Sequence, residues 1–331
     1  MRIIILGGAG FIGINFLKTI IKNKKYNILN IDKLSYASNK KEIKKLSIYK
    51  NYTFKKIDIS NYSKINNAIN AFKPNRIINF AAETHVDNSI KSSLEFVKSN
   101  YLGTYNLLLS SQNFYNKLSA LNKKKFIFFQ ISTDEVYGSL KKNDNKFTEE
   151  HQINPRSPYS ATKAGSDHLV KSWFHTYNLP VFVSHCSNNF GPFQHKEKLI
   201  PKTIECCINK KTIPIYGKGK QIREWIYVQD HVEAILHILK FGKIGQSYNI
   251  GSGFEIENIN LVKQICRIYN ELSKSSFNTV KLIKFVQDRP GHDFRYSLNS
   301  KKIKNLKWNN KYNFEISLTR TIIWYMNNIK K

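Results

Sequence analysis

Residues 1–13 read MRIIILGGAGFIG, in which a short apolar run over 3–6 leads directly into a cluster of glycines. The residues that follow place apolar side chains on one face of a helix, namely Phe16, Leu17, Ile20 and Ile21. Glycines permit a tight turn from strand to helix and let the backbone approach a pyrophosphate, which the helix N-terminus attracts. The spacing fits both GxGxxG and GxxGxxG and predicts a dinucleotide-binding turn.

An acidic residue follows at the distance that such a turn requires. The second apolar run, over 28–31, ends at Asp32, nineteen residues after Gly13. A carboxylate at this place hydrogen-bonds the hydroxyls of the adenosine ribose and repels a 2′-phosphate. We therefore expect NAD rather than NADP.

Apolar, β-branched runs alternate with segments of helical period through the first half of the chain. These runs cover 3–6, 28–31, 53–57, 76–80, 126–131 and 181–185. Strands that are apolar on both faces and separated by helices predict an α/β fold of the Rossmann type, with a doubly wound parallel sheet.

Beyond about residue 190 the pattern is less regular, with helices expected over 199–209, 229–241, 258–272 and 315–328. We expect an NAD-binding domain with the catalytic residues over 1–190 and a smaller α/β substrate lobe over 191–331. The boundary is approximate and the two lobes are expected to interleave.

The 331 residues carry a formal net charge of +30, and only eight of the 53 basic residues are arginines. Nucleic-acid readers rely on arginine for bidentate contacts. Here the lysines are scattered among Asn and Ile, which indicates that the charge lies on solvent-exposed surfaces. No nucleic-acid partner is therefore expected. Neither a secretory signal nor an apolar stretch of membrane-spanning length is present, and we expect a cytoplasmic protein.

The four cysteines, Cys186, Cys206, Cys207 and Cys266, show neither a CxxC spacing nor a neighbouring His cluster. We expect buried thiols in a reducing compartment, and no metal site or disulfide framework.

Tyr159 and Lys163 stand four residues apart, on a helix expected to begin just after Pro158. Side chains at this spacing share one helix face. An ammonium group and the positive charge of a bound cofactor are expected to lower the pKa of the phenol from about 10. The tyrosine could then accept a hydroxyl proton as hydride leaves the carbon.

The fifth apolar run ends in ISTDEVYG, residues 131–138. The hydroxyl of Thr133 is placed to hydrogen-bond a substrate oxygen beside Tyr159. Asp134 and Glu135 could serve as general acid and general base on neighbouring carbons, a task that requires two carboxyl groups with different pKa values.

The chain resembles the extended branch of the short-chain dehydrogenase/reductase superfamily, and within it the dTDP-glucose 4,6-dehydratase family of nucleotide-sugar metabolism. The resemblance runs from GGAGFIG through NIDKLSYA, AAETHVDNSI, ISTDEVYG, SPYSATKAGSDHLV, CSNNFGP, EKLIP, PIYGKGKQIREWIYVQDH and YNIGSG to DRPGHDFRY. It implies a hydro-lyase of deoxysugar biosynthesis, of the rhamnose type, with NAD as cofactor, dTDP-glucose as substrate and a homodimer formed by pairing helices, one of them the helix after Tyr159.

The family mechanism implies that Tyr159 takes the C4 hydroxyl proton, that Glu135 removes the C5 proton and that Asp134 protonates the departing C6 hydroxyl. With Thr133 and Lys163 these are the expected catalytic residues. The expected cofactor contacts are Gly7, Gly10, Phe11, Ile12, Gly13, Asp32, Lys33, Leu34, Asp58, Ile59, Ala81, Ala82, Ser99, Tyr159, Lys163 and Asn189. The expected substrate contacts are Thr84, Thr133, Asn188, Lys198, Leu199, Pro214, Ile215, Tyr216, Arg223, Asn258, Asp288, Arg289, Pro290, Gly291 and His292.

Two departures from the family pattern are Phe193, where a tyrosine is frequent, and a short insertion over 139–158. His195 is expected to be an ordinary loop histidine. Three alternatives stay open: a nucleotide-sugar 4-epimerase, which needs the Tyr/Lys pair but no paired acids; a UDP- or GDP-sugar dehydratase; and a non-catalytic NAD-binding or nucleic-acid-binding module.

Overall fold

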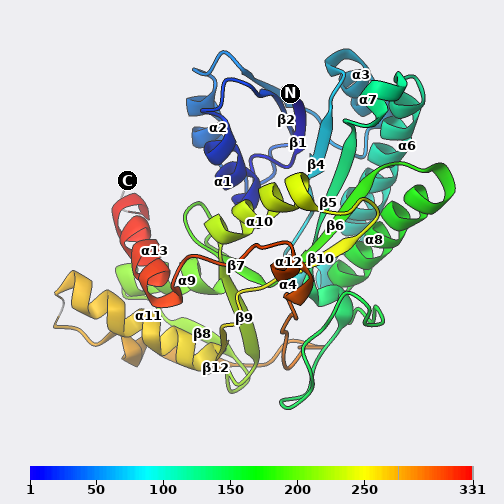
Figure 1. Ribbon diagram of the computed structural model, residues 1–331. Helices are drawn as coiled ribbons and strands as arrows, with labels where there is room; N and C mark the ends of the chain where they lie inside the picture. Colours follow the sequence, from blue (N-terminus) through cyan, green and yellow to red (C-terminus); the bar gives the residue numbers. More distant parts are fainter. Residues whose placement is uncertain (275, 330–331) are drawn as a thin grey trace.

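The computed structural model describes residues 1–274 and 276–329. Within them the main sheet has seven parallel strands in the order β10-β6-β5-β4-β1-β2-β3 (Figure 1). The strands are β1 (Arg2–Leu6), β2 (Asn27–Asp32), β3 (Tyr52–Lys56), β4 (Arg76–Asn79), β5 (Ile127–Thr133), β6 (Val181–Cys186) and β10 (Ser247–Ile250). The six strands predicted from the sequence are confirmed to within two residues, and β10 was not predicted.

Helices cover both faces of this sheet, as a doubly wound fold requires (Figure 1). One face carries α1 (Phe11–Ile20) and α10 (Val228–Phe241), which pack on each other, with the short α2 (Lys40–Leu46) and α12 (Lys301–Asn305) beside them. The other face carries α3 (Tyr62–Phe72), α6 (Gly103–Asn116) and α8 (Pro158–Tyr177). Each face buries its own apolar core, so the Rossmann-type class is confirmed.

Short elements connect these helices to the sheet. They are α4 (Val86–Lys91), α5 (Leu94–Phe96), the π-helix η1 (Val97–Leu102), α7 (Ala120–Lys123) and the 3₁₀ helix η2 (Asp134–Tyr137). None of the helices in the described part of the chain is long and apolar enough to cross a membrane.

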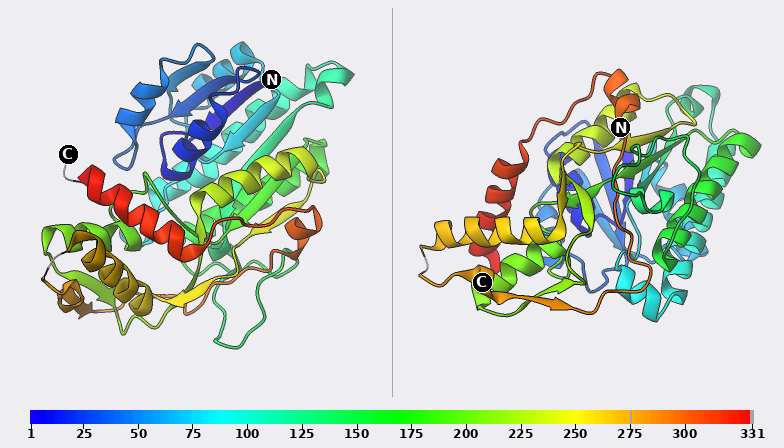
Figure 2. Two further views of the ribbon diagram at one scale, coloured as in Figure 1. Left: turned by 60° about the vertical axis from the view of Figure 1, so that its left-hand side comes forward. Right: turned by 90° about the horizontal axis from the view of Figure 1, so that it is seen from below.

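A smaller part lies beyond the carboxyl edge of the main sheet, with α9, α11 and α13 grouped together (Figure 2). It contains β7 (Asn188–Phe190), α9 (Leu199–Asn209), β8 (Ile213–Tyr216), β9 (Ile222–Tyr227), β11 (Glu255–Glu257), α11 (Asn258–Ser273), η3 (Thr279–Leu282), β12 (Ile283–Val286) and α13 (Phe314–Ile329). The four helices that the sequence predicts beyond residue 190 correspond to α9, α10, α11 and α13, and all four are confirmed to within one residue. A third apolar core holds α9, α11 and α13 together.

The chain passes between the two parts more than once. After β7 it forms α9 and β8 in the smaller part, and it then returns to the main sheet as α10 and β10. The predicted division near residue 190 stays a prediction.

The helix α8 begins where the sequence predicts. Ser157 caps it, since its Oγ accepts a hydrogen bond from the backbone N–H of Ser160 at 3.1 Å, and Pro158 occupies the first turn. Proline suits this position because its missing N–H would have no partner within the helix. The cap fixes the start of the helix and therefore the place of Tyr159 beside the end of β5.

Candidate active site

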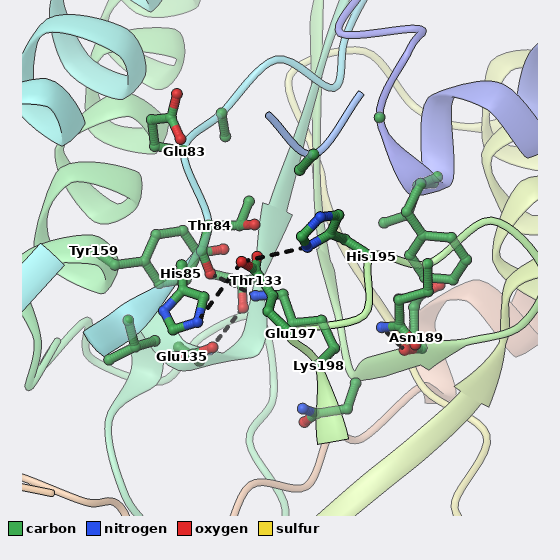
Figure 3. Close-up of a pocket in the computed structure, with 18 of the residues that line it drawn as sticks. Glu83, Thr84, His85, Thr133, Glu135, Tyr159, Asn189, His195, Glu197 and Lys198 are labelled. Carbon is green, nitrogen blue, oxygen red and sulfur yellow. Dashed lines mark hydrogen bonds and ion pairs between the residues drawn. The ribbon is translucent and has the colours of Figure 1, made fainter. Parts of the chain in front are cut away.

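A cavity of about 800 Å³ lies at the carboxyl ends of the main strands, between them and the smaller part. Parallel strands in register end at one edge, so the loops after β1, β2, β4 and β5 meet there. Figure 3 shows Thr133, Glu135 and Tyr159 converging on this cavity, with His195, Glu197 and Lys198 on the opposite wall. The fold thus places the predicted dinucleotide turn and the predicted catalytic residues around one space.

The glycine turn has no room for side chains on its protein side. A Cβ on Gly7, whose φ is +74°, would lie 2.5 Å from the backbone nitrogen of Ala81. One on Gly13 would lie 2.4 Å from the carbonyl oxygen of Gly7. A Cβ on Gly10 would meet only the carbonyl oxygen of Gly7, at 3.2 Å, and Gly10 lines the cavity in front of α1. Backbone this bare at a helix N-terminus fits the pyrophosphate of a dinucleotide.

Asp32 ties the glycine turn to the loop after β2. Its Oδ2 accepts a hydrogen bond from the backbone N–H of Ala9 at 2.9 Å, and its Oδ1 accepts one from Leu34 at 2.7 Å. Burial raises the pKa of this carboxyl, while the two hydrogen bonds act in the opposite direction. Asp32 lines the cavity at the place where the sequence predicts the ribose of NAD.

The remaining predicted cofactor contacts also line the cavity, with two exceptions. Those that line it are Phe11, Ile12, Lys33, Ile59, Ala81, Ala82, Ser99, Tyr159, Lys163 and Asn189. Leu34 and Asp58 do not. The backbone of Leu34 holds Asp32 instead, and Asp58 caps its own loop by accepting a hydrogen bond from Ser60 N–H at 2.9 Å.

Tyr159 and Lys163 lie one helical turn apart on α8, and both are buried. Lys163 Nζ donates a hydrogen bond to the backbone carbonyl of Ile131 at 2.8 Å. Burial raises the pKa of the Tyr159 phenol well above its usual value, and the charge of Glu135 adds to this effect. In the protein without its cofactor, removal from water therefore sets the direction of this pKa, and the expected lowering by Lys163 together with the cofactor charge stays a prediction.

The two adjacent acids face different surroundings. Thr133 Oγ1 donates to Asp134 Oδ1 at 3.2 Å and accepts from the backbone N–H of Glu135 at 3.3 Å. Burial raises the pKa of Asp134 well above its usual value, and the carboxylates of Glu135 and Glu224 raise it further. The other oxygen of Asp134 accepts no hydrogen bond from any residue that the structure describes. Asp134 is therefore suited to carry a proton.

Glu135 has cations around it. Burial raises its pKa, but Arg289, Arg223 and Lys198 all act to lower it. The ionised form of Glu135 is thus better supported than that of Asp134. The sequence predicts one acid and one base at these positions, and the electrostatics separate them in that sense.

The far end of the cavity is basic. Arg223 is buried and stacks over the ring of Tyr296 at 4.3 Å, while its guanidinium donates to the backbone carbonyls of Ile222, Asp293 and Phe294. Arg289 also lines this end, 3.8 Å from Asp87. Two guanidinium groups in a partly dry cavity suit the diphosphate of a nucleotide sugar.

Most predicted substrate contacts line the cavity. They are Thr84, Thr133, Asn188, Lys198, Leu199, Pro214, Ile215, Tyr216, Arg223, Asn258, Arg289 and His292. Asp288, Pro290 and Gly291 do not line it. Asp288 instead shapes their loop by accepting hydrogen bonds from His292 Nδ1 at 2.6 Å and from Gln221 at 2.9 Å.

Sequence reasoning missed a group of wall residues that joins three loops. Glu197 Oε2 accepts a hydrogen bond from Tyr36 OH at 2.9 Å and lies 3.4 Å from His195 Nδ1 and 3.8 Å from His85 Nε2 (Figure 3). His195, expected to be an ordinary loop histidine, therefore lines the cavity. Glu197, Tyr36 and His85 lie in the stretches EKLIP, NIDKLSYA and AAETHVDNSI that carry the resemblance, which was the signal available for them.

Tyr296 and Trp225 also line the cavity and were not predicted. Both lie in stretches quoted for the resemblance: Tyr296 is the last residue of DRPGHDFRY, and Trp225 stands in PIYGKGKQIREWIYVQDH, two positions after Arg223. Within the described residues, no group of three or more His, Cys, Asp or Glu side chains is arranged to hold a metal ion.

Comparison with known proteins finds 4,6-dehydratases. The family described as GDP-mannose 4,6 dehydratase matches residues 4–321. A dTDP-glucose 4,6-dehydratase of Haemophilus influenzae is 44% identical over 333 residues, covering 99% of this chain and 98% of the relative.

Two solved structures have the same fold over the whole chain. The dTDP-glucose 4,6-dehydratase of Bacillus anthracis in complex with NAD is 38% identical, with a TM-score of 0.87, and the match covers 100% of this chain and 98% of that one. The enzyme of the same name from Streptomyces venezuelae, with NAD bound, is 33% identical with a TM-score of 0.90 and the same coverage.

Proposed function

This chain belongs to the dTDP-glucose 4,6-dehydratase family, and we propose that the residues around the cavity divide the family's reaction among a base for C4, a base for C5 and an acid for C6. The protein is a hydro-lyase that removes water from dTDP-glucose in deoxysugar biosynthesis, and its product is dTDP-4-keto-6-deoxyglucose. NAD is its cofactor.

The glycine turn and Asp32 hold the cofactor. NAD bound there would take up the hydride from sugar C4 and supply it again to C6, so that the cofactor would end the reaction unchanged. Gly10 and Gly13 present bare backbone and the N-terminus of α1 to the pyrophosphate, and Asp32 accepts hydrogen bonds from the ribose hydroxyls.

Tyr159 takes the proton of the C4 hydroxyl as that carbon is oxidised. Its phenol lies on the cavity wall beside Thr133, whose hydroxyl hydrogen-bonds the same sugar oxygen. Lys163 is the nearest cation on the helix, fixed by its hydrogen bond to Ile131, and it stabilises the phenolate. A C4 ketone results.

The ketone acidifies the C5 hydrogen, and the paired acids then complete the elimination. Glu135, supported by its cationic neighbours, removes the C5 proton. Asp134, kept protonated by burial and by neighbouring carboxylates, donates its proton to the C6 oxygen, which leaves as water. A double bond forms between C5 and C6, conjugated with the ketone.

One observation supports a dehydratase over an epimerase of the same fold: a buried acid and a half-buried base follow Thr133 beside the Tyr159–Lys163 pair. An epimerase needs that pair but has no use for the two acids. The test is incubation of the NAD-loaded protein with dTDP-glucose, UDP-glucose and GDP-mannose in parallel. Loss of the mass of one water from dTDP-glucose alone is expected, and an isomer of unchanged mass would reject the assignment.

We further propose a homodimer formed through η1, α6 and α8. An apolar stripe with helical spacing stays exposed along α5, η1 and α6, made up of Leu94, Val97, Tyr101, Leu102 and Tyr105. Tyr105 packs edge-to-face on Trp173 of α8, so the stripe continues onto the catalytic helix. A second copy that pairs the same helices would cover it.

A cytoplasmic location is supported by the thiols. All four cysteines are free and buried, and the sulfurs of Cys207 and Cys266 lie 3.8 Å apart. Thiols this close stay reduced in a reducing compartment.

We keep the division near residue 190 as a functional one, with catalytic residues before it and most of the nucleotide-sugar contacts after it.

A further inference from the structure

Five buried polar side chains lie behind the Tyr159–Lys163 pair and join α8 to β5, β6, η2 and β10. They are Ser132, Tyr137, Asp167, His185 and Asn249, and none is more than 4% exposed. No step of the proposed mechanism uses them. Two of them, Asp167 and His185, can carry charge, and burial makes an unpaired charge costly there.

Asp167 stands one turn beyond Lys163 on α8, as Lys163 stands one turn beyond Tyr159. Its Oδ2 accepts a hydrogen bond from Ser132 Oγ at 2.6 Å and lies 3.3 Å from His185 Nε2. The carboxyl therefore contacts an imidazole on one side and acts electrostatically on the Lys163 ammonium on the other.

The other nitrogen of His185 faces a phenol. His185 Nδ1 lies 3.0 Å from Tyr137 OH, and Tyr137 OH donates to Asn249 Oδ1 at 2.9 Å. The amide of Asn249 cannot turn around without loss, because its Nδ2 donates to the carbonyl of Phe147 at 2.9 Å. The single proton of Tyr137 is thus committed to Asn249.

These contacts fix the number of protons in the pair. Because Tyr137 donates to Asn249, the proton between Tyr137 and His185 must come from Nδ1. Nε2 makes no well-aligned hydrogen bond, but it lies 3.3 Å from Asp167 Oδ2, so the lone pairs of the two atoms would repel each other unless one of the two groups carries a further proton. With that proton, Asp167 and His185 together carry no net charge, whichever of the two holds it.

We propose that Asp167 and His185 are positioning residues that share one proton and so leave Lys163 as the uncompensated cation behind Tyr159. Without His185, Asp167 would be a lone carboxylate one turn from the Lys163 ammonium and would offset its charge. The phenol of Tyr159 would then be harder to ionise. The proposal rests on the role proposed above for Tyr159, and it adds the groups that set the charge around it.

Other titratable groups face the same region. Asp134 and Glu135 of η2 and Cys186 of β6 act on Tyr159, and Glu149 reaches the cluster by accepting a hydrogen bond from Asn249 N–H at 2.7 Å. All of them stay in place in the variants below, so differences among the variants report on Asp167 and His185.

Two substitutions separate charge from hydrogen bonding. His185→Gln keeps a donor facing Asp167 but cannot carry a positive charge. Asp167→Asn keeps an acceptor for Ser132 and a donor for a neutral His185, and it removes the negative charge. In the double variant both positions carry neutral amide side chains, so the net charge of the pair is again zero although no proton is shared.

The first readout is an ultraviolet difference titration of the Tyr159 phenol in the NAD-loaded protein, with Tyr159→Phe in the same background subtracted. We expect His185→Gln to raise the titration midpoint by about one pH unit, as a nearby like charge does. Asp167→Asn and the double variant should stay close to the parent. The second readout, single-turnover reduction of the cofactor by dTDP-glucose at neutral pH, should fall about tenfold in His185→Gln and recover in the double variant.

A purely structural role predicts the opposite order, with both single variants impaired and the double variant worst. That order, or an unchanged midpoint in His185→Gln, overturns the proposal. If His185→Gln does not fold, His185→Asn replaces it and carries the same expectation. If the parent fails to oxidise dTDP-glucose, the proposed function is wrong, while the phenol titration still decides the charge proposal.

Discussion

At the scale of single residues, the chemistry depends on how unequal the environments of similar groups are. Asp134 is buried and its neighbour Glu135 is half-buried. The first faces other carboxylates, whereas the second faces Arg223, Arg289 and Lys198. A shared strand end therefore delivers an acid and a base together. For Tyr159 the environment works against the proposed role, because burial raises the pKa of the phenol whereas the role requires the phenol to ionise.

Replacement of Tyr159 by phenylalanine removes the proposed C4 base and leaves the cavity wall in place. We expect turnover of dTDP-glucose to fall by roughly 10²–10⁴, the range for loss of a positioned acid or base. Steady-state kinetics measure it. Tyr62→Phe, on the outer helix α3, should keep normal turnover. Near-normal turnover in Tyr159→Phe would mean that another group takes the C4 proton.

At the scale of elements, the glycine turn offers a matched pair of substitutions. Gly7 and Gly253 both have positive φ, +74° and +85°, but a Cβ on Gly7 would meet the backbone of Ala81 whereas one on Gly253 would meet nothing within 4 Å. Gly253→Ala should cost only the backbone term, about 1–2 kcal/mol. Gly7→Ala should lower the melting temperature further and abolish NAD binding in calorimetric titration. Equal losses in both variants would contradict the packing argument.

The sequence predicts most elements because their signals are local. The glycine turn, the Pro158 start of α8 and the six apolar strands each lie within a few consecutive residues, and all are confirmed. β10 was not predicted because two of its four residues, Ser247–Ile250, are polar, so it does not form the continuous apolar run from which the other strands were predicted. It becomes a strand because β6 offers it a parallel edge.

Site residues that depend on distant loops could not be predicted in the same way. Tyr36, His85 and Glu197 come from three separate loops, and no sequence spacing connects them. The pair of Asp167 and His185 likewise requires the register of α8 against β6. The expected catalytic and substrate residues were predicted because each of them except Asn258 lies in a stretch that carries the family resemblance.

At the scale of the whole molecule, the exposed stripe on η1 and α6 predicts the oligomeric state. Tyr101→Glu places a charge in the centre of the proposed dimer contact and should shift the protein to a monomer in sedimentation velocity. Phe285→Glu is the control, since Phe285 is an exposed aromatic side chain on β12 in the smaller part. A dimer that survives Tyr101→Glu would place the contact elsewhere.

The pH dependence of folding is expected to include a contribution from His231. This side chain is fully buried on α10, lies 2.9 Å from Asn189 Oδ1, and has its pKa lowered to about 3 by burial. Between pH 6.5 and 3 the unfolded chain binds a proton there that the folded chain does not. The stabilisation is therefore complete above pH 6.5 and is lost as the pH falls, by up to about 1.4 kcal/mol per pH unit.

Urea unfolding at several pH values measures this slope. His231→Gln should be less stable at neutral pH but should lose less stability on acidification. The slope of its unfolding free energy against pH should be smaller by the contribution of roughly one proton. His175→Gln, at an exposed position on α8, should follow the parent. Parallel curves for parent and His231→Gln would contradict the buried neutral state of His231.

The most direct test of the central claim follows deuterium at sugar C5 in heavy water. NAD-loaded Glu135→Gln and Asp134→Asn are each given dTDP-glucose in a single turnover, with absorbance of the reduced cofactor and the mass of the recovered nucleotide sugar as readouts. Both variants should oxidise C4 and fail to dehydrate. Glu135→Gln should take up little deuterium at C5, whereas Asp134→Asn should take up an appreciable amount, because only its C6 proton donor is missing. Rapid C5 exchange in Glu135→Gln, or continued dehydration in both variants, would contradict the division of roles between the two acids.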